Sequence, residues 1–383
     1  VEPGLRSEAE SNGSVGTLIV LQAKAPKQLL SPEGNYLERR RELVSMLRAT
    51  AEVTQADLRN WLDAQGVRYR PFWIVNMVEA DLNAAQIDAL AARGDIARIE
   101  ANREIALQRP ALGPWPDASS DGASAHAPQA IEWGVNKVRA PLVWAEGFNG
   151  QGVVVAGQDT GIRWTHNAIK AKYRGWNGIT ADHNYNWHDA IHETGSSCGA
   201  NSLVPCDDHS HGSHTVGTMV GDDGGSNQVG VAPGAKWIGC RNMNAGVGTP
   251  ARYNECAEWF LAPTDLNGQN PDPDRAPDVI NNSWGCPADE GCTAGNEVRQ
   301  AIENLVAGGI VFVASAGNDG SSCQTIFSQP GTLDAAFVVG SMTSSDTMSG
   351  FSSRGPVPGL GEVKPDVIAP GSSVRSITNS GDN

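Results

Sequence analysis

Apolar and polar positions in the first hundred residues follow two different periods. Short apolar runs predict strands at 16–22, 68–77 and 96–107. Apolar spacing near 3.6 predicts helices at 36–65 and 84–93. The polar, Gly- and Ser-containing segment 1–14 predicts a flexible tail. The order strand, helix, strand, helix, strand therefore predicts a small open α+β domain over 15–107.

The pattern changes after residue 107. Prolines, glycines and serines without a core pattern indicate a linker over 108–130. Continuously apolar strands then recur at 153–156, 235–240, 279–280, 310–314 and 337–339, with helical stretches between them at 212–221, 250–262 and 293–307. This alternation predicts an α/β domain over 131–383, with a mainly parallel sheet covered by helices on both faces. In such sheets, functional side chains follow the carboxyl ends of strands.

Charge and cysteine content narrow the class of protein. The net charge of −15 argues against nucleic acid or an anionic membrane as a partner, and no run of 18 apolar residues predicts a membrane span. All seven cysteines follow residue 197, and close pairs such as Cys198/Cys206 and Cys286/Cys292 favour local disulfides formed in an oxidising compartment. The odd number leaves one thiol over, for which Cys323 is a candidate. The chain begins with valine and shows no signal peptide, so a leader was removed or the sequence is partial. We expect a secreted, extracellular protein.

Polar residues at the ends of predicted elements suggest catalysis. Asp159 follows the strand at 153–157, and Asn318 follows the strand at 310–314, where its amide could donate to a developing oxyanion. The densest polar cluster, 207–214, leads into a helix. Two chemistries remain open for it. One is a zinc site built from His209, His211 and His214; the other is a single imidazole acting as general base at a helix N-terminus, where the helix dipole disfavours the imidazolium.

The order of these motifs resembles that of the subtilisin family of serine peptidases. The matching runs are Asp-Thr-Gly at 159–161, His-Gly-Ser-His at 211–214, Asn-x-Ser-x-Gly at 281–285, Ala-Gly-Asn at 316–318, Phe-Ser-Ser-Arg-Gly-Pro at 351–356 and Lys-Pro-Asp-Val-Ile-Ala-Pro-Gly at 364–371. The runs at 206–211 and 281–286 are most similar to the bacillopeptidase F branch. Residues 16–107 resemble the inhibitory propeptide of these enzymes, which has a ferredoxin-like fold. An unrelated accessory domain is the alternative.

The resemblance implies a role for each catalytic residue. Asp159 would orient and stabilise the base, His211 would act as general base and then general acid, and Asn318 would donate to the oxyanion. His209 and His214 would be structural, because a triad needs one imidazole.

The resemblance also implies where substrate binds. A strand edge that pairs with an extended substrate would be formed by Ser283, Trp284 and Gly285. Trp284 could instead be a core residue. The primary specificity pocket would be lined by Ala314, Ser315, Ala316 and Gly317. None of these is charged, so we expect an apolar or broad preference.

Two departures from the family pattern bear on activity. Ser213 replaces the usual threonine and keeps its hydroxyl. The family's nucleophile lies in a Gly-Thr-Ser-Met-Ala run one loop after the strand at 364–371, and no Gly-Thr-Ser occurs in this chain. We therefore expect a serine endopeptidase that forms an acyl-enzyme through an Asp-His-Ser triad, with its nucleophile beyond Asn383 and this chain alone inactive. The alternatives are a truncated, non-catalytic subtilase acting as a binding module, and a zinc hydrolase.

The expected partners follow from this interpretation. They are protein or peptide substrates and the chain's own propeptide, which would inhibit intramolecularly until cleavage within 108–130. We expect a monomer that binds no nucleic acid. The chemistry requires no cofactor. The acidic runs at 222–223 and 272–274 could hold calcium, which many members of the family bind, or could be solvated loops.

Overall fold

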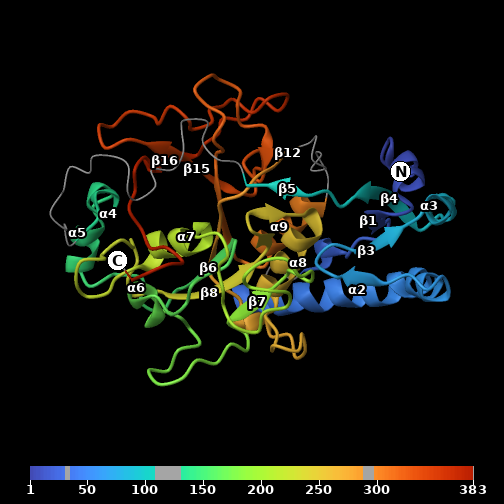
Figure 1. Cartoon of the computed structure of the whole chain (residues 1–383), viewed down its shortest axis with the longest axis horizontal. Coiled ribbons are helices and arrows are strands. Elements are labelled where there is room, and N and C mark those ends of the chain that lie inside the picture. Colours follow the sequence, from blue (N-terminus) through green and yellow to red (C-terminus); the bar gives the residue numbers. More distant parts are fainter. Residues whose placement is uncertain (31–34, 108–130, 288–296, 383) are drawn as a thin grey trace.

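The chain folds into a small N-terminal domain and a larger α/β domain (Figure 1). A computed structural model describes residues 1–30, 35–107, 131–287 and 297–382. The linker predicted over 108–130 lies outside the described residues, so its cleavage stays a prediction. In the part of the chain that is described, no helix is long and apolar enough to span a membrane.

The N-terminal domain is built on a four-stranded antiparallel sheet with the order β2-β3-β1-β4. Its elements are β1 (Val15–Leu21), α2 (Tyr36–Ala64), β2 (Tyr69–Phe72), β3 (Met77–Leu82), α3 (Ala84–Ala91) and β4 (Ile96–Ala101), with a short 3-10 turn, η1, at Lys27–Leu29. This chain order and this pairing are those of a ferredoxin-like domain. Both helices begin at an asparagine that closes a capping box, Asn35 with Glu38 and Asn83 with Gln86.

The prediction of a flexible tail over 1–14 is wrong. Residues Leu5–Asn12 form helix α1, and its two apolar residues, Leu5 and Ala9, are buried in one cluster with Ile87 and Leu90 of α3. Two apolar residues four positions apart are too few to give a periodic signal, but they form a stripe that packs on a neighbouring helix.

The strand predicted over 68–77 is also shorter than expected. The chain turns after Phe72 and returns from Met77 as β3, which pairs antiparallel with β2. Apolar residues in the turn, Ile74 and Val75, are fully buried, so the turn carries the same hydrophobic signal as the strands that flank it. The hairpin is therefore hidden from a reading of apolar runs.

The larger domain contains a seven-stranded sheet, confirming the predicted fold class. Every pairing in it is parallel, and the strand order is β16-β15-β13-β11-β6-β8-β7. The strands are β6 (Val154–Asp159), β7 (Trp187–Asp189), β8 (Lys236–Arg241), β11 (Val279–Asn282), β13 (Val311–Ser315), β15 (Phe337–Met342) and β16 (Val367–Pro370). Outside this sheet, β12 (Cys286–Pro287) pairs with β14 (Ser328–Gln329).

Helices pack on both faces of the large sheet (Figure 1). One face is covered by α6 (Asn167–Lys170) and α7 (His211–Val220), and the other by α8 (Pro250–Leu261) and α9 (Glu297–Ala307). The larger domain also contains α4 (Trp133–Lys137), α5 (Ala140–Ala145) and a 3-10 turn, η2, at Pro273–Arg275. Successive residues of a strand point to opposite faces. In β6, Val155 belongs to the core with α6 and α7, and Ala156 belongs to the core with α8 and α9.

Part of the α7 face of the sheet is uncovered within the described residues. Val155 and Val311 are both level with Val279 of the strand between them, so they share this face. At the far edge, Val311, Phe337 and Val367 are 51%, 46% and 44% exposed. Three neighbouring strands thus present apolar side chains to solvent.

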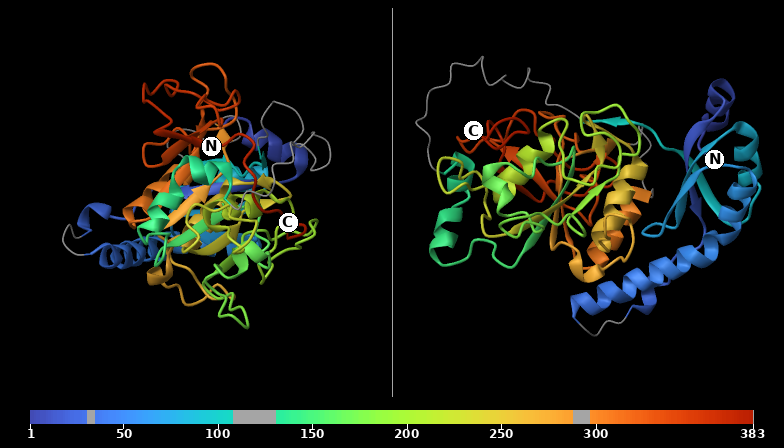
Figure 2. Two further views of the ribbon diagram at one scale, coloured as in Figure 1. Left: turned by 90° about the vertical axis from the view of Figure 1, so that its left-hand side faces the viewer. Right: turned by 60° about the horizontal axis from the view of Figure 1, so that its bottom comes forward.

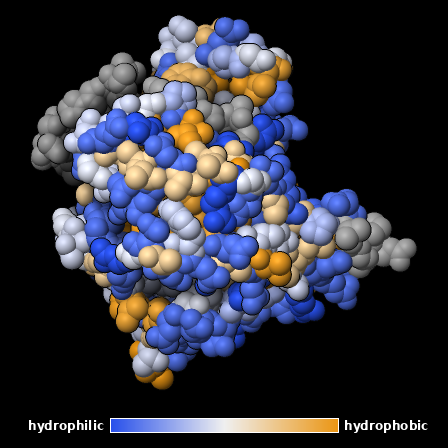
Figure 3. Space-filling view, turned by 90° about the vertical axis from the view of Figure 1, so that its right-hand side faces the viewer, coloured by the Kyte–Doolittle hydropathy of each residue, from blue (hydrophilic) through white to orange (hydrophobic). Residues whose placement is uncertain are grey.

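The two domains share a core. Ile19 and Leu21 of β1 belong to the N-terminal domain's own apolar cluster, whereas Leu18 and Val20 belong to the cluster that contains α8 and α9. One face of the small sheet is therefore buried against the larger domain. The surface of the molecule seen from the side of the N-terminal domain is mainly hydrophilic, with apolar residues in small separate groups (Figure 3).

Helix α2 extends beyond the small sheet and lies along the larger domain (Figure 2). Arg40 of this helix is 2% exposed and donates from Nε to the carbonyl oxygen of Gly308 at 2.7 Å. Its Nη1 donates to the carbonyl oxygen of Pro273 at 3.2 Å. These bonds fix the helix against two loops of the other domain.

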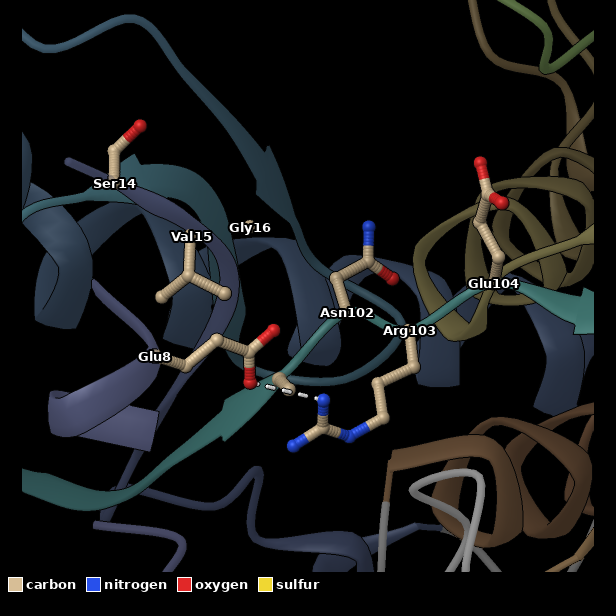
Figure 4. Close-up of a pocket in the computed structure, with 8 residues that line it drawn as sticks. Glu8, Ser14, Val15, Gly16, Asn102, Arg103 and Glu104 are labelled. Atoms are coloured by element: carbon tan, nitrogen blue, oxygen red, sulfur yellow. Dashed lines mark hydrogen bonds and ion pairs between the residues drawn. The ribbon is translucent and has the colours of Figure 1, made fainter. Parts of the chain in front are cut away.

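After β4 the chain leaves the small domain as an extended tail. Arg103 is paired with Glu2 and Glu8 at the side of a hollow between α1, β1 and the tail (Figure 4). The tail then forms β5 (Ile105–Ala106), antiparallel to β10 (Val247–Gly248), which also pairs with β9 (Met243–Asn244). The strand predicted over 96–107 is therefore two strands in two sheets, one in each domain.

Candidate active site

The carboxyl ends of three neighbouring strands bring predicted site residues to one edge of the large sheet. Asp159 is the last residue of β6, Ser283 follows β11, and Asn318 lies in the segment after β13. In the sheet, β11 lies between β6 and β13. Because parallel strands all end at the same edge, the site lies where α/β sheets carry their functional residues.

Asp159 and His211 form a buried hydrogen-bonded pair. Helix α7 begins at His211, and the ring Nδ1 lies 2.7 and 2.9 Å from the two carboxylate oxygens of Asp159. The Asp159 side chain is 2% exposed and the His211 side chain 21%. Since Nδ1 donates to Asp159, Nε2 is the ring nitrogen left to accept or release a proton.

The pKa of His211 is raised, contrary to the effect expected from the helix dipole alone. Burial lowers this pKa, but the charge of Asp159, its hydrogen bond and the charge of Asp207 outweigh that effect. The imidazolium is thus stabilised by two carboxylates. A base in this setting holds a proton more firmly than a free histidine does.

A second group of predicted residues lines one pocket. The pocket is formed by Leu107, Ser283, Trp284, Gly285, Ser315, Ala316, Gly317, Asn318, Ser328 and Gly331. The structure therefore brings both predicted substrate-binding runs and the predicted oxyanion donor to one place. Ala314 lies apart from them; it is 1% exposed inside β13 and packs in the core.

The conformation of the chain at the pocket is constrained at two residues, Trp284 and Gly317. Trp284 is 3% exposed and stacks on Tyr253 with ring centroids 3.9 Å apart, so it belongs to the core and also lines the pocket. Gly317 has a φ of +100°, and a Cβ at this position would lie 2.8 Å from Oγ of Ser353. Only glycine fits that backbone without strain.

Leu107 is a pocket residue that the sequence did not single out. Its backbone N–H donates to the carbonyl oxygen of Gly246 at 2.8 Å, next to the pairing of β5 with β10. The tail of the N-terminal domain therefore runs into the pocket as an added antiparallel strand. The only signal in the sequence is that the predicted strand over 96–107 ends immediately before the linker.

The histidines of 207–214 point to different partners. His211 binds Asp159, and Nε2 of His214 lies 3.1 Å from the carbonyl oxygen of Val374. The ring of His209 meets that of His211 edge-on, with centroids 6.4 Å apart. Within the described ranges, no group of three or more His, Cys, Asp and Glu side chains is arranged to hold a metal ion.

The acidic runs considered for calcium make hydrogen bonds within their own loops. Oδ1 of Asp223 accepts from the backbone N–H groups of Gly225 and Asn227. Asp272 accepts from the N–H of Asp274 and from Arg275. A calcium ion at either run stays a prediction.

The disulfides are local, as predicted from the spacing of the cysteines. Cys198 is bonded to Cys206, in the loop before the histidine cluster, and Cys240 of β8 is bonded to Cys256 of α8. Cys286 is also disulfide-bonded. Among the described cysteines Cys323 is free and exposed, which agrees with its choice as the unpaired candidate.

Comparisons of sequence agree with the geometry. Residues 150–383 match the subtilase family. Bacillopeptidase F from Bacillus subtilis (strain 168) is 33% identical over 365 residues, which cover 92% of this chain and 24% of that protein. The chain thus spans about a quarter of that relative's length. Subtilisin DY from Bacillus licheniformis is 31% identical over 250 residues, covering 65% of this chain and 75% of that protein.

A comparison of structures supports the same fold. A mutant of the epidermin leader peptide processing serine protease from Staphylococcus aureus matches with a TM-score of 0.63 at 15% identity, covering 94% of this chain and 76% of that one. At this identity the likeness concerns the fold alone. The family match, however, covers more than half of the chain and includes Asp159, His211 and Asn318. The chain therefore belongs to the subtilase family, the subtilisin-type serine peptidases.

Proposed function

We propose that this chain carries the general base, its orienting carboxylate and an oxyanion donor of a secreted serine endopeptidase. The observation that carries the proposal is the hydrogen bond from Nδ1 of His211 to Asp159, at the edge of the sheet where Asn318 lines a pocket. A buried carboxylate that fixes one imidazole nitrogen leaves the other free for proton transfer.

In the proposed reaction, Nε2 of His211 takes the proton from a serine hydroxyl as the serine oxygen attacks the peptide carbonyl carbon. The Asn318 amide donates to the oxyanion that forms. His211 then gives the proton to the leaving amine, and an acyl-enzyme remains until water releases it by the same exchange of protons. Asp159 stabilises the imidazolium that exists between these steps, and no cofactor takes part.

We place the nucleophilic serine in sequence that follows Asn383 in a longer form of the protein. No Gly-Thr-Ser run occurs in residues 1–383. The exposed Val311, Phe337 and Val367 on the α7 face fit a further apolar segment that covers them. Without the serine, residues 1–383 should hydrolyse no peptide bond.

We further propose that the N-terminal domain is an intramolecular inhibitor. Its tail pairs with β10 and delivers Leu107 to the pocket, in the antiparallel manner in which an extended peptide adds to a sheet edge. A peptide substrate that pairs with Ser283–Gly285 would enter the same pocket. The tail and a substrate should therefore exclude each other.

Contacts between the domains support tight inhibition. Oε2 of Glu258 on α8 accepts from the backbone N–H groups of Trp73 and Ile74 at 2.5 and 2.9 Å. Arg70 of β2 pairs with Glu255, one turn earlier on α8. Together with the shared core, these bonds hold the small domain against the helix that leads from β10.

The remaining parts of the proposal concern processing. Cleavage within 108–130 would separate the domains, in a segment outside the described residues. The disulfides fit a protein exported to an oxidising compartment. The proposed partners are protein or peptide substrates, and the active form would be a monomer.

The test is peptide hydrolysis by a form of the protein that extends past Asn383 through a Gly-Thr-Ser segment. We expect hydrolysis after maturation, with a new N-terminus within 108–130. His211→Ala should remove nearly all of it. His214→Ala is the matched control and should retain most activity. Activity that survives His211→Ala, or that a chelator abolishes and zinc restores, would overturn the proposal.

A further inference from the structure

A buried carboxylate outside the catalytic pair organises the start of α7. Asp207 is 8% exposed and accepts five hydrogen bonds. Its Oδ1 accepts from Oγ1 of Thr160 and the N–H groups of His209 and Ser210, each at 2.9 Å. Its Oδ2 accepts from the N–H and the Oγ of Ser213, at 2.9 and 2.6 Å. Five donors from four residues thus converge on one buried carboxylate.

Asp207 accepts a hydrogen bond from the first turn of α7 that the side chain of the N-cap residue does not accept. The N-cap of α7 is Ser210, which has a φ of +79° and makes no side-chain cap bond. The free N–H groups of the first turn need acceptors. Asp207 supplies one for Ser213, and Oγ1 of Thr160 supplies one for Gly212 at 3.0 Å. A negative charge at this end of a helix is also favoured by the helix dipole.

The same bonds connect the two halves of the catalytic pair. Thr160 follows Asp159, and its N–H donates to Oδ1 of Asp159 at 2.7 Å. Its hydroxyl joins Asp207 to the backbone of Gly212, the residue after His211. The segment after β6 and the first turn of α7 are thus tied together through one hydroxyl and one carboxylate.

The position of Asp207 is itself fixed on both sides. Cys206 before it is bonded to Cys198. Asp208 after it pairs at 2.5 Å with Arg241, whose side chain is fully buried and also pairs with Asp189. A carboxylate held in this way can set the geometry of its neighbours.

We propose that Asp207 is a positioning residue for the proposed peptidase reaction, holding Asp159 and His211 in register and stabilising the imidazolium through its charge. The inference rests on the proposed function. The ionisable groups that face His211 are Asp159 on β6, Asp207 before α7, His209 beside it and His214 on α7. Burial lowers the pKa of His214. The positive charge on His211 is therefore balanced mainly by the two carboxylates.

The first test is a pH titration of His211 in residues 1–383. It is monitored by NMR of ring-labelled histidine, so it needs no enzymatic activity. Asp207→Asn should lower the pKa of His211, because one of the two stabilising charges is gone. Asp222→Asn, at the other end of α7, removes the same charge and keeps an acceptor for its bond to Gly224, so it should leave the titration unchanged. Equal titrations in the Asp207→Asn protein and the parent would overturn the inference.

The second test is kinetic and uses the form that extends past Asn383. Asp207→Asn should lower kcat by about tenfold to a hundredfold with little change in KM, because misplacement of the base acts on the chemical step. The acid limb of the pH profile of kcat/KM should move to lower pH, a shift that a loss of folded protein alone cannot produce. Asp207→Glu should restore the position of that limb in part.

Thr160→Val covers the case in which Asp207→Asn does not fold. It breaks the link between the segments but keeps the charge of Asp207, so kcat should fall while the pKa of His211 changes less than in Asp207→Asn. Unchanged kcat in Thr160→Val would overturn the inference. An inactive extended enzyme whose His211 still responds to Asp207→Asn would instead contradict the proposed function alone.

Discussion

The backbone N–H of Leu107 donates a hydrogen bond to the carbonyl oxygen of Gly246, 2.8 Å away. The two residues are far apart in the sequence and belong to different domains. The bond continues the antiparallel pairing of Ala106 with Val247 and of Ile105 with Gly248. It places the end of the N-terminal domain in the pocket that contains Asn318, so in the proposed function the inhibitory tail and a peptide substrate would occupy the same pocket.

The side chain of Ile105 should hold the tail in place. Ile105 is 1% exposed in the core shared with α8, whereas Ala106 beside it is exposed. Ile105→Asp would bury a charge and should release the tail, raising amide hydrogen exchange at Leu107 by about tenfold or more. Ala106→Asp is the control and should leave exchange unchanged. Equal exchange in the two variants would show that the tail is not anchored by this side chain.

Arg40 should matter more to stability than the neighbouring Arg41. Arg40→Met removes a buried guanidinium and leaves the carbonyl oxygens of Gly308 and Pro273 without these donors, which should cost about 2 to 3 kcal/mol. Arg41 pairs with Asp274 in an exposed position, so Arg41→Met should leave the urea midpoint unchanged. Urea unfolding measures the stability of both variants. A larger loss of unfolding free energy in Arg41→Met than in Arg40→Met would contradict the prediction.

The hold between the domains should weaken as pH rises. Burial raises the pKa of Glu258 to about 8, although hydrogen bonds from Ile74 and Trp73 oppose the shift. In the unfolded chain the same carboxyl has its ordinary pKa of 4.5. Between these two values the folded state holds a proton that the unfolded state releases. The stability that is present below pH 4.5 is therefore lost as pH rises through about 8.

Glu258→Gln tests this pH dependence directly. The amide mimics the neutral acid and its oxygen can still accept from both N–H groups. The variant should resemble the parent near pH 4 and be more stable than the parent at pH 8, in thermal unfolding. Glu52→Gln, on the exposed side of α2, is the control for a lost charge. A parent and a Glu258→Gln protein with parallel pH profiles would contradict the account.

The Cys240–Cys256 bond should stabilise the larger domain. It joins β8 to α8, and both cysteines are fully buried. Replacing both by alanine should cost about 3 kcal/mol, since the bond closes a loop of 16 residues. Cys323→Ser should change nothing, because that thiol is free and exposed. A urea midpoint that is equal in the parent, the double-alanine variant and Cys323→Ser would refute the expectation.

The sequence predicts those parts of the fold that local pattern determines. The strands β6, β8 and β13 are apolar runs, and α3 is a short amphipathic stretch that follows the N-cap Asn83. The pattern does not predict helix α1, because its contacts with α3 lie far away in the sequence. It does not predict strand β7 either, because two of the three residues from Trp187 to Asp189 are polar.

The same distinction between local pattern and distant contacts applies to the catalytic pair and the residues that support it. The sequence predicts Asp159 and His211 as a catalytic pair because each lies at an element boundary, in motifs that follow the order of the subtilisin family. The link from Asp207 to Thr160 and the bond of Leu107 to Gly246 join residues about 50 and 140 positions apart, which no local pattern reveals. The sequence shows that Asp207 is polar, but only the fold shows that five donors converge on it.

The most direct measurement is covalent labelling of the form that extends past Asn383 with a fluorophosphonate, with the modified residue located by mass spectrometry. We predict one adduct, on a serine that follows Asn383. Labelling should be lost in His211→Ala and retained in His214→Ala, because a serine reacts only when a base removes its proton. Peptide hydrolysis without an adduct, or an adduct that forms equally well in His211→Ala, would contradict the account.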